Sequence, residues 1–215
     1  MKSCLTVLPP ARQSRVNFQR TVIGKSVIPS IKRGKVMNVD KKNLVRLYLL
    51  FIPIAYFSYL FHEFGHWIVG EILGNDMIYS LNYVWPRSGH YLNESHNLYV
   101  SIGGPAFTIL LALISLLVFE KYSTIYAYIV LFFQFVLRFF SLVFGGFDQQ
   151  DEARVSSIMR LGTYTVGIII LIILLLIVMR ASYKLKIDLK HNGYFFTASI
   201  LSQLLVIATY KIFSL

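Results

Sequence analysis

A short pattern in the sequence, His62-Glu63-Phe64-Gly65-His66, has residue types and spacing that could hold a metal ion. On a helix, residues i and i+4 share one face with their Cβ atoms about 5–6 Å apart, close enough for two imidazoles to bind one zinc ion. Glu63 lies about 100 degrees round the helix from His62, so it falls beside such an ion rather than on it. We therefore expect Zn²⁺ on His62 and His66, with Glu63 as the catalytic general base for water.

Two histidines leave such a site incomplete, because a catalytic zinc ion usually has three protein ligands. The acidic candidates are Asp148 and Asp151, which follow the third apolar stretch of the chain. Asp148 would extend a polar stripe on that stretch that includes Gln134 and Arg138. Either aspartate could instead cap a short helix over residues 152–160. These alternatives stay open on the residues alone.

Other residues near this pattern are candidates for substrate binding. Pro105 removes a backbone donor, and Gly104 allows close backbone approach, which suits a peptide that must unwind before it is attacked. Plain helix packing explains the glycine equally well. Arg138 is a full charge inside an apolar stretch and is therefore a functional candidate. It could pair with Glu63 or an aspartate, bind substrate carbonyls, or extend toward lipid headgroups.

The composition is that of a membrane protein. The chain of 215 residues is 56% hydrophobic and only 14% charged, whereas soluble domains have about 25% charged residues. Several apolar stretches are long enough to cross about 30 Å of hydrocarbon, and they span residues 47–73, 98–119, 123–144, 163–179 and 194–213. The predicted fold class is an all-α, polytopic membrane helix bundle of about five transmembrane helices. Partial alternation over residues 78–85 predicts a short β-hairpin-like loop after the first helix.

The basic residues are distributed unevenly along the chain. The net charge is +11, and eleven of the 21 Lys and Arg residues lie in residues 1–46. This tail has no aromatic interleaving and leads directly into an apolar stretch, so we expect it to face the lipid bilayer and expect no nucleic-acid partner. With five spans, a cytoplasmic N-terminus satisfies the positive-inside rule and places the site toward the opposite face. Residues 1–36 could also be an organellar presequence, or could precede a true start at Met37.

Three regions follow from this distribution. Residues 1–43 form a basic, flexible tail or presequence, residues 44–162 form a catalytic core of three helices, and residues 163–215 supply two additional transmembrane helices. The end of the first span, the start of the second and the end of the third lie at the same membrane face, whichever way the protein is inserted. The histidines, Gly104 and the aspartates are therefore expected to meet.

Residues 47–162 resemble the site-2 protease family of intramembrane zinc metalloproteases. His62-Glu63-Phe64-Gly65-His66 is similar to the family's HExxH, and residues 104–108 resemble its Gly-Pro-x-x-Asn segment, with Thr108 in place of Asn. Residues 151–155 resemble its Leu-Asp-Gly-Gly-Arg segment, whose Asp is the third zinc ligand. The glycines of that segment are replaced by Glu152 and Ala153, and a preceding Asn-Pro element is absent.

The resemblance implies Asp151 as the third ligand, with Asp148 as the alternative, and adds Thr108 to Gly104, Pro105 and Arg138 as candidate substrate-binding residues. It implies a zinc-dependent endopeptidase that hydrolyses a peptide bond in or near a transmembrane segment of a membrane-protein substrate. Two alternatives remain open: a catalytically inactive membrane adaptor of the same fold, which the altered 151–153 segment favours, and a metal or proton transporter, because intramembrane ionisable residues also line ion pathways.

Overall fold

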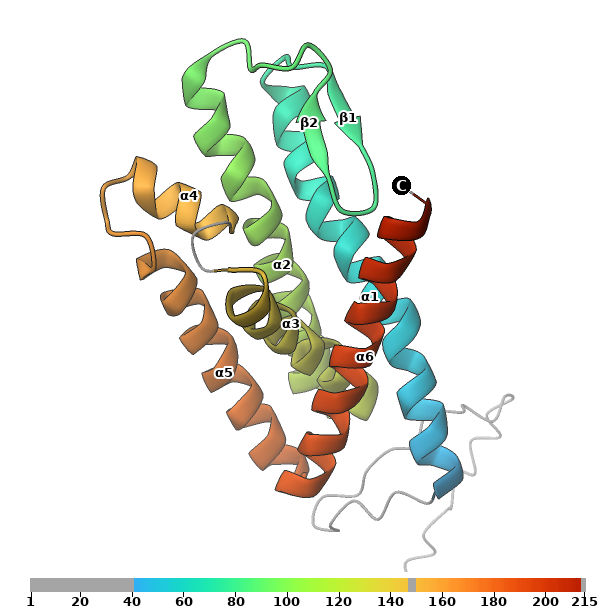
Figure 1. The fold of residues 1–215 in the computed structure, drawn as a ribbon. Coiled ribbons are helices and arrows are strands. Elements are labelled where there is room, and N and C mark those ends of the chain that lie inside the picture. The colour runs from blue at the N-terminus through green and yellow to red at the C-terminus, as the bar shows by residue number, and fades with distance from the viewer. Residues whose placement is uncertain (1–40, 147–149, 214–215) are drawn as a thin grey trace, which may run out of the picture.

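The computed structural model describes residues 41–146 and 150–213 as a bundle of helices with one hairpin (Figure 1). The helices are α1 (Lys41–Ile72), α2 (Glu94–Tyr122), α3 (Ile125–Phe144), α4 (Asp151–Ile158), α5 (Thr165–Leu185) and α6 (Leu189–Phe213). Strands β1 (Met77–Tyr79) and β2 (Val84–Pro86) pair in antiparallel fashion, with Ile78 opposite Trp85. The predicted all-α bundle with a short hairpin after the first span is confirmed.

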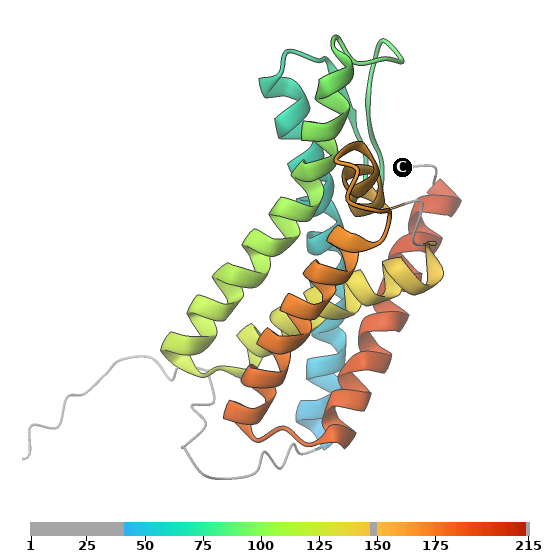
Figure 2. The same cartoon turned by 90° about the vertical axis from the view of Figure 1, so that its left-hand side faces the viewer.

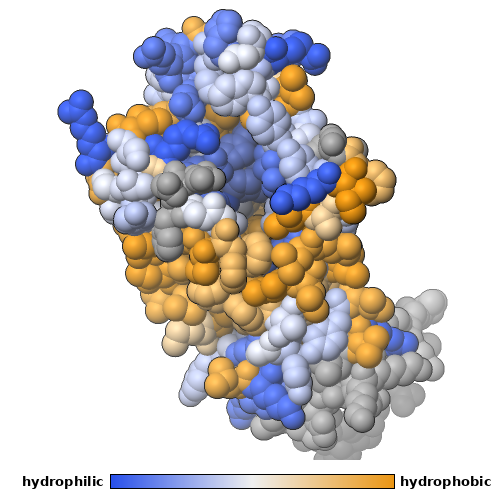
Figure 3. All heavy atoms as spheres, viewed as in Figure 1, coloured by the Kyte–Doolittle hydropathy of each residue, from blue (hydrophilic) through white to orange (hydrophobic). Residues whose placement is uncertain are grey.

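Among the described residues, five helices are long and apolar enough to cross a membrane, namely all except α4. Figure 3 shows the corresponding apolar band between two hydrophilic ends of the molecule. The chain is therefore a multi-pass membrane protein. The fourth span continues to Leu185, beyond the predicted end at residue 179, and stops where Lys186 adopts a positive φ of 54°. Of the predicted tail, residues 1–40 lie outside the described part, and residues 41–43 belong to α1.

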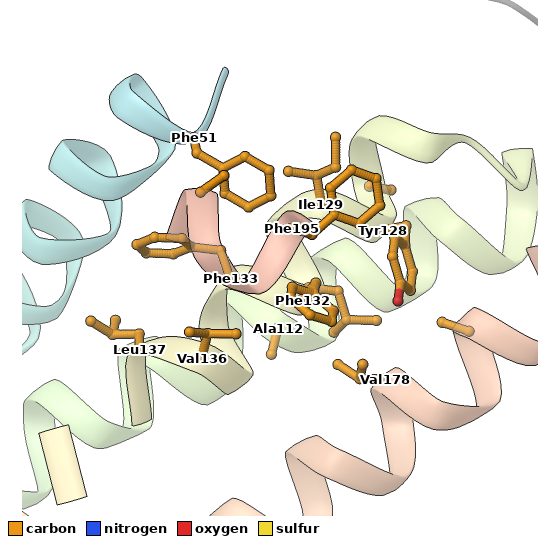
Figure 4. Close-up of a cluster of buried hydrophobic side chains, with 14 of the residues drawn as sticks. Phe51, Ala112, Tyr128, Ile129, Phe132, Phe133, Val136, Leu137, Val178 and Phe195 are labelled. Carbon is orange, nitrogen blue, oxygen red and sulfur yellow. The ribbon is translucent and has the colours of Figure 1, made fainter. Parts of the chain in front are cut away.

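α3 is the central helix of the bundle and the most deeply buried of the five spans. It crosses obliquely between the other long helices (Figures 1 and 2) and packs against α1, α2, α5 and α6. Its apolar contacts converge on an aromatic cluster in the half of the bundle near the α5–α6 turn (Figure 4). Phe51 of α1 lies 6.4 Å from Phe133 of α3 and 5.9 Å from Phe195 of α6, measured between ring centroids.

α1 and α2 contact each other directly at two glycines. A methyl group on Gly65 would overlap the backbone carbonyl of Gly103, and a methyl group on Gly103 would overlap that of Gly65. Small residues at such positions allow helix backbones to pack directly in a membrane. This contact fixes the turn of α1 that carries the histidines against the start of α2.

The hairpin lies over the same end of α1. The Tyr79 hydroxyl donates a 2.7 Å hydrogen bond to the Leu60 carbonyl, and the Tyr79 ring packs edge-on against Trp67. At the end of α1, Gly74 has a positive φ of 83°, and the Asn75 N–H bonds to the Gly70 carbonyl, a common helix-ending arrangement. The turn after α1 thus folds the hairpin back along the helix that carries the histidines.

Candidate metal centre

His62, His66 and Asp151 bring three metal-binding atoms together from two separate elements, α1 and α4. The two Nε2 atoms lie 3.2 Å apart, and Asp151 Oδ2 lies 3.3 Å from His62 Nε2 and 3.2 Å from His66 Nε2. Ligands of a tetrahedral zinc ion, with bonds of about 2.0–2.1 Å, are separated by about 3.3–3.4 Å. The triangle formed by these atoms therefore has the dimensions of three zinc ligands.

Gly104 of α2 leaves room for an ion in front of the two imidazoles. A methyl group at this position would overlap His66 Nε2 and would lie 2.6 Å from His62 Nε2. A zinc ion bound to both nitrogens needs this space, because its bonds to nitrogen measure only about 2.0–2.1 Å. Both the spacing of the donor atoms and the space beside them fit a zinc ion.

The hydrogen bonding of His66 prepares its Nε2 atom for a metal. Its Nδ1 atom lies 2.6 Å from the Val100 carbonyl oxygen, which can only accept a hydrogen bond. Nδ1 therefore carries the proton, and in the neutral ring the lone pair lies on Nε2. A backbone carbonyl on the far nitrogen is the usual way in which proteins orient a metal-binding histidine.

His62 is arranged differently. Its Nδ1 atom lies 2.9 Å from Thr108 Oγ1 and 2.9 Å from an Nη2 atom of Arg138. A guanidinium has only donors, so Nδ1 accepts from Arg138, and the ring proton lies on Nε2. With a metal on Nε2, the ring proton would lie on Nδ1, from which it would donate to Thr108 Oγ1. Thr108 is therefore placed to orient His62, and Arg138 must then release Nδ1.

Arg138 has a partner that the sequence interpretation did not name. Its Nη1 atom lies 2.9 Å from Glu152 Oε1 and 3.2 Å from Oε2, and both side chains are almost fully buried. Glu152 neutralises the charge that Arg138 brings into the bundle and ties α3 to α4. The buried glutamate at position 152 is thus explained by the arginine inside the third span.

Asp151 is the first residue of α4 and not its N-cap, since Gln150 occupies the cap position. Burial by itself raises the pKa of the Asp151 carboxyl, but the contacts of this carboxyl with His62 and His66 outweigh burial and hold its pKa well below its ordinary value. The carboxylate is therefore ionised, as a metal ligand must be. The alternative ligand, Asp148, lies outside the described residues.

A cavity of about 330 Å³ opens in front of the three donors. Glu63 lines it, is 8% exposed, and makes no side-chain hydrogen bond to any residue that the structure describes. Arg138 lines the cavity as well, and its role in substrate binding stays a prediction. The opposite wall comes from the hairpin and the loop after it, and includes Tyr83, Trp85 and Tyr91.

The other predicted substrate-binding residues lie elsewhere. Gly104, Pro105 and Thr108 are buried and do not line the cavity. Gly104 and Thr108 contact the imidazoles, so the geometry gives them supporting roles at the metal centre. The sequence interpretation missed Glu152, although an arginine inside a span signals that a carboxylate lies at the same depth. It also treated Trp85 as equally well explained by the aromatic belt at the membrane surface.

The sequence matched no protein-family model, and it matched neither a curated protein nor a solved structure. The case for any function therefore rests on the residues and geometry described above.

Proposed function

We propose that this chain is a zinc-dependent intramembrane peptidase that resembles the site-2 proteases. The observation that carries the proposal is the convergence of His62, His66 and Asp151 within 3.3 Å of one another at the end of a membrane-spanning helix. Ionisable side chains cost free energy in the apolar part of a membrane. A cation bound by the two histidines and the aspartate would offset this cost. The HExxH pattern places a free carboxylate, Glu63, in the same cavity.

Zinc, when bound, supplies a Lewis acid that polarises a peptide carbonyl and acidifies water. The chain's own residues supply the rest of the chemistry. Glu63 takes a proton from the attacking water and returns it to the nitrogen of the leaving amine. Val100 and Thr108 orient the two imidazoles through their Nδ1 atoms. The hairpin covers the cavity and limits the access of bulk water.

The substrate class follows from where the cavity lies. It opens among helices that cross the membrane, so a substrate chain reaches it from the bilayer or its surface. Its volume of about 330 Å³ is at the small end of ligand pockets, which suits a short unwound segment and not an intact helix. We further propose that the N-terminus is cytoplasmic and that the site opens toward the opposite face, in line with the charge distribution.

The experiment that tests the proposal compares wild type with Glu63→Gln in lipid nanodiscs. Both proteins are loaded with zinc and incubated with a pool of transmembrane peptides, and products are identified by mass spectrometry. We expect Glu63→Gln to retain zinc and to cleave more slowly by about 10²- to 10⁴-fold, the usual contribution of a general base.

Glu71→Gln is the matched control, because Glu71 lies on the same helix. Its Oε1 atom accepts a 2.9 Å hydrogen bond from the Met77 N–H, and glutamine retains such an oxygen. This variant should cleave like wild type. Cleavage by Glu63→Gln at the wild-type rate, or no cleavage of any peptide by zinc-loaded wild type, would contradict the proposal and favour an adaptor.

A further inference from the structure

Arg154 of α4 is a cationic side chain on the cavity wall that the proposed hydrolysis does not use. Its side chain is 43% exposed, so the guanidinium is accessible from the cavity. Its Nη1 atom donates a 3.1 Å hydrogen bond to Ser101 Oγ. The other nitrogens of the guanidinium make no hydrogen bond to the residues that the structure describes.

Among the residues that the structure describes, the acid that Arg154 approaches is Asp151, but their contact is weak. Arg154 Nη1 lies 3.6 Å from Asp151 Oδ1, which is too long for a hydrogen bond. The other oxygen of the same carboxylate faces the two histidines. An ion at this site takes up the negative charge of Asp151 and adds positive charge next to Arg154. The exposed guanidinium of Arg154 would then be available to an anion from outside the chain.

The remaining charged groups of the cavity wall do not supply one. Glu63 makes no hydrogen bond to Arg154, and Arg138 is a cation that already holds Glu152. Arg154 lies beside the donor triangle, so an anion bound to it lies about one side chain from the metal centre. A peptide advances at most about 3.3–3.6 Å per residue, which places that anion within one or two residues of the bond that is cut.

We propose that Arg154 determines specificity by binding a carboxylate of the substrate, and that the cavity selects peptides with such a group next to the scissile bond. This inference rests on the proposed function, because it names the substrate class of the same site. A guanidinium binds a carboxylate through two parallel hydrogen bonds, and this geometry makes it selective for that group. The carboxylate is either an acidic side chain or the C-terminus of a chain.

Binding is measured without turnover on zinc-loaded Glu63→Gln protein in phosphatidylcholine nanodiscs. Trp85 lines the cavity, and the chain has 2 tryptophans, so Trp67→Phe leaves Trp85 as the fluorescent reporter. Three acetylated Ala/Leu peptides serve as probes. One has an internal Glu and an amidated C-terminus, the second has Gln and a free C-terminal carboxylate, and the third has Gln and an amidated C-terminus.

We expect one of the two acidic peptides to bind about tenfold more tightly than the neutral peptide, because a hydrogen bond to a charged group contributes about this much. The peptide that binds more tightly shows whether the carboxylate comes from a side chain or from the C-terminus. Arg154→Gln should bring all three affinities within twofold of each other. Arg160→Gln, which alters an exposed arginine just after the same helix, should leave the preference intact. Zinc is measured on each variant, and any variant with reduced zinc is compared at full occupancy.

Equal binding of the three peptides by the unaltered cavity would overturn the inference, as would a preference that survives Arg154→Gln. These results are separable from a failure of the proposed function. Hydrolysis is assayed in protein that retains Glu63, so cleavage without a carboxylate preference rejects only the role of Arg154. An Arg154-dependent preference without cleavage of any peptide leaves the binding site standing and rejects the peptidase.

Discussion

Two halves of this bundle are held together by different interactions. In the aromatic half, near the α5–α6 turn, buried rings such as Phe51, Phe133 and Phe195 pack against one another. In the site half, near the hairpin, charged and polar side chains also join the helices: Arg138 joins Glu152, and Asp151 faces the histidines. Apolar packing tolerates small shifts, whereas charged groups in a membrane must meet their partners. The aromatic half is therefore stabilised by packing, and the site half depends in addition on charged groups that must keep their partners.

The strongest test of this contrast is Gly104→Ala. The added methyl group occupies the space beside His62 Nε2 and His66 Nε2, so we expect zinc affinity to fall by more than about a hundredfold, beyond the loss of an outer-shell partner. Zinc per purified protein, measured by mass spectrometry against a chelator series, reports the change. The control is Gly193→Ala on α6, where a methyl group meets nothing within 4 Å. Full zinc occupancy in Gly104→Ala would show that the ion does not lie between these imidazoles.

The buried Arg138–Glu152 pair should give the largest effect on stability. Removal of one member leaves an uncompensated buried charge, so Arg138→Met or Glu152→Met alone should cost about 3–5 kcal/mol of unfolding free energy. The double variant Arg138→Met/Glu152→Met should recover most of this loss, because no charge is left unpaired. Unfolding in mixed micelles by increasing SDS measures all three variants. Losses that simply add in the double variant would mean that the two side chains do not depend on each other.

Phe133→Ala should weaken the aromatic half without altering the metal centre. Phe133 is fully buried in the cluster, but the unfolded helices remain in lipid, which is as apolar as the protein core. The loss is therefore mainly one of packing, and we expect about 2–3 kcal/mol, at the low end for phenylalanine truncation. Zinc affinity of the folded protein should stay unchanged. Phe144→Ala, at an exposed ring of the same helix, is the control and should lower the free energy of unfolding less. A loss of zinc affinity in folded Phe133→Ala would contradict the contrast between the halves.

Thr108→Val is the most local change. It keeps the shape of the side chain but removes the hydroxyl that lies 2.9 Å from His62 Nδ1. We expect zinc to bind about ten- to hundredfold more weakly, as when an outer-shell partner is lost, and Thr108→Ser should restore binding. Thr197→Val on α6 removes a hydroxyl whose hydrogen bond goes to the backbone of its own helix. The zinc affinity of this control should therefore equal that of wild type. An unchanged affinity in Thr108→Val would mean that another group orients His62.

The sequence predicted the parts of the site that depend on local spacing. His62 and His66 lie one helical turn apart, so their shared face follows from helix geometry alone. Asp151 was favoured only by a resemblance over five residues, because its distance from the histidines depends on how α4 packs against α2. Tertiary packing of this kind also determines the Arg138–Glu152 pair and the position of Trp85 in the cavity wall. The periodicity of the sequence carries no information about such packing.

The direct contact between Gly65 and Gly103 has a consequence for the way a substrate enters. At these two glycines backbone meets backbone, and the rings of Phe61 and Phe64 pack against Phe107 across the same pair of helices, so this part of the α1–α2 seam leaves no open passage. On the proposed function, a polypeptide substrate would therefore arrive from the other side, where side chains of α3, α4 and the hairpin line the cavity. Replacements that loosen the hairpin should thus speed entry, whereas changes on the lipid-facing side of the α1–α2 seam should leave it unaltered.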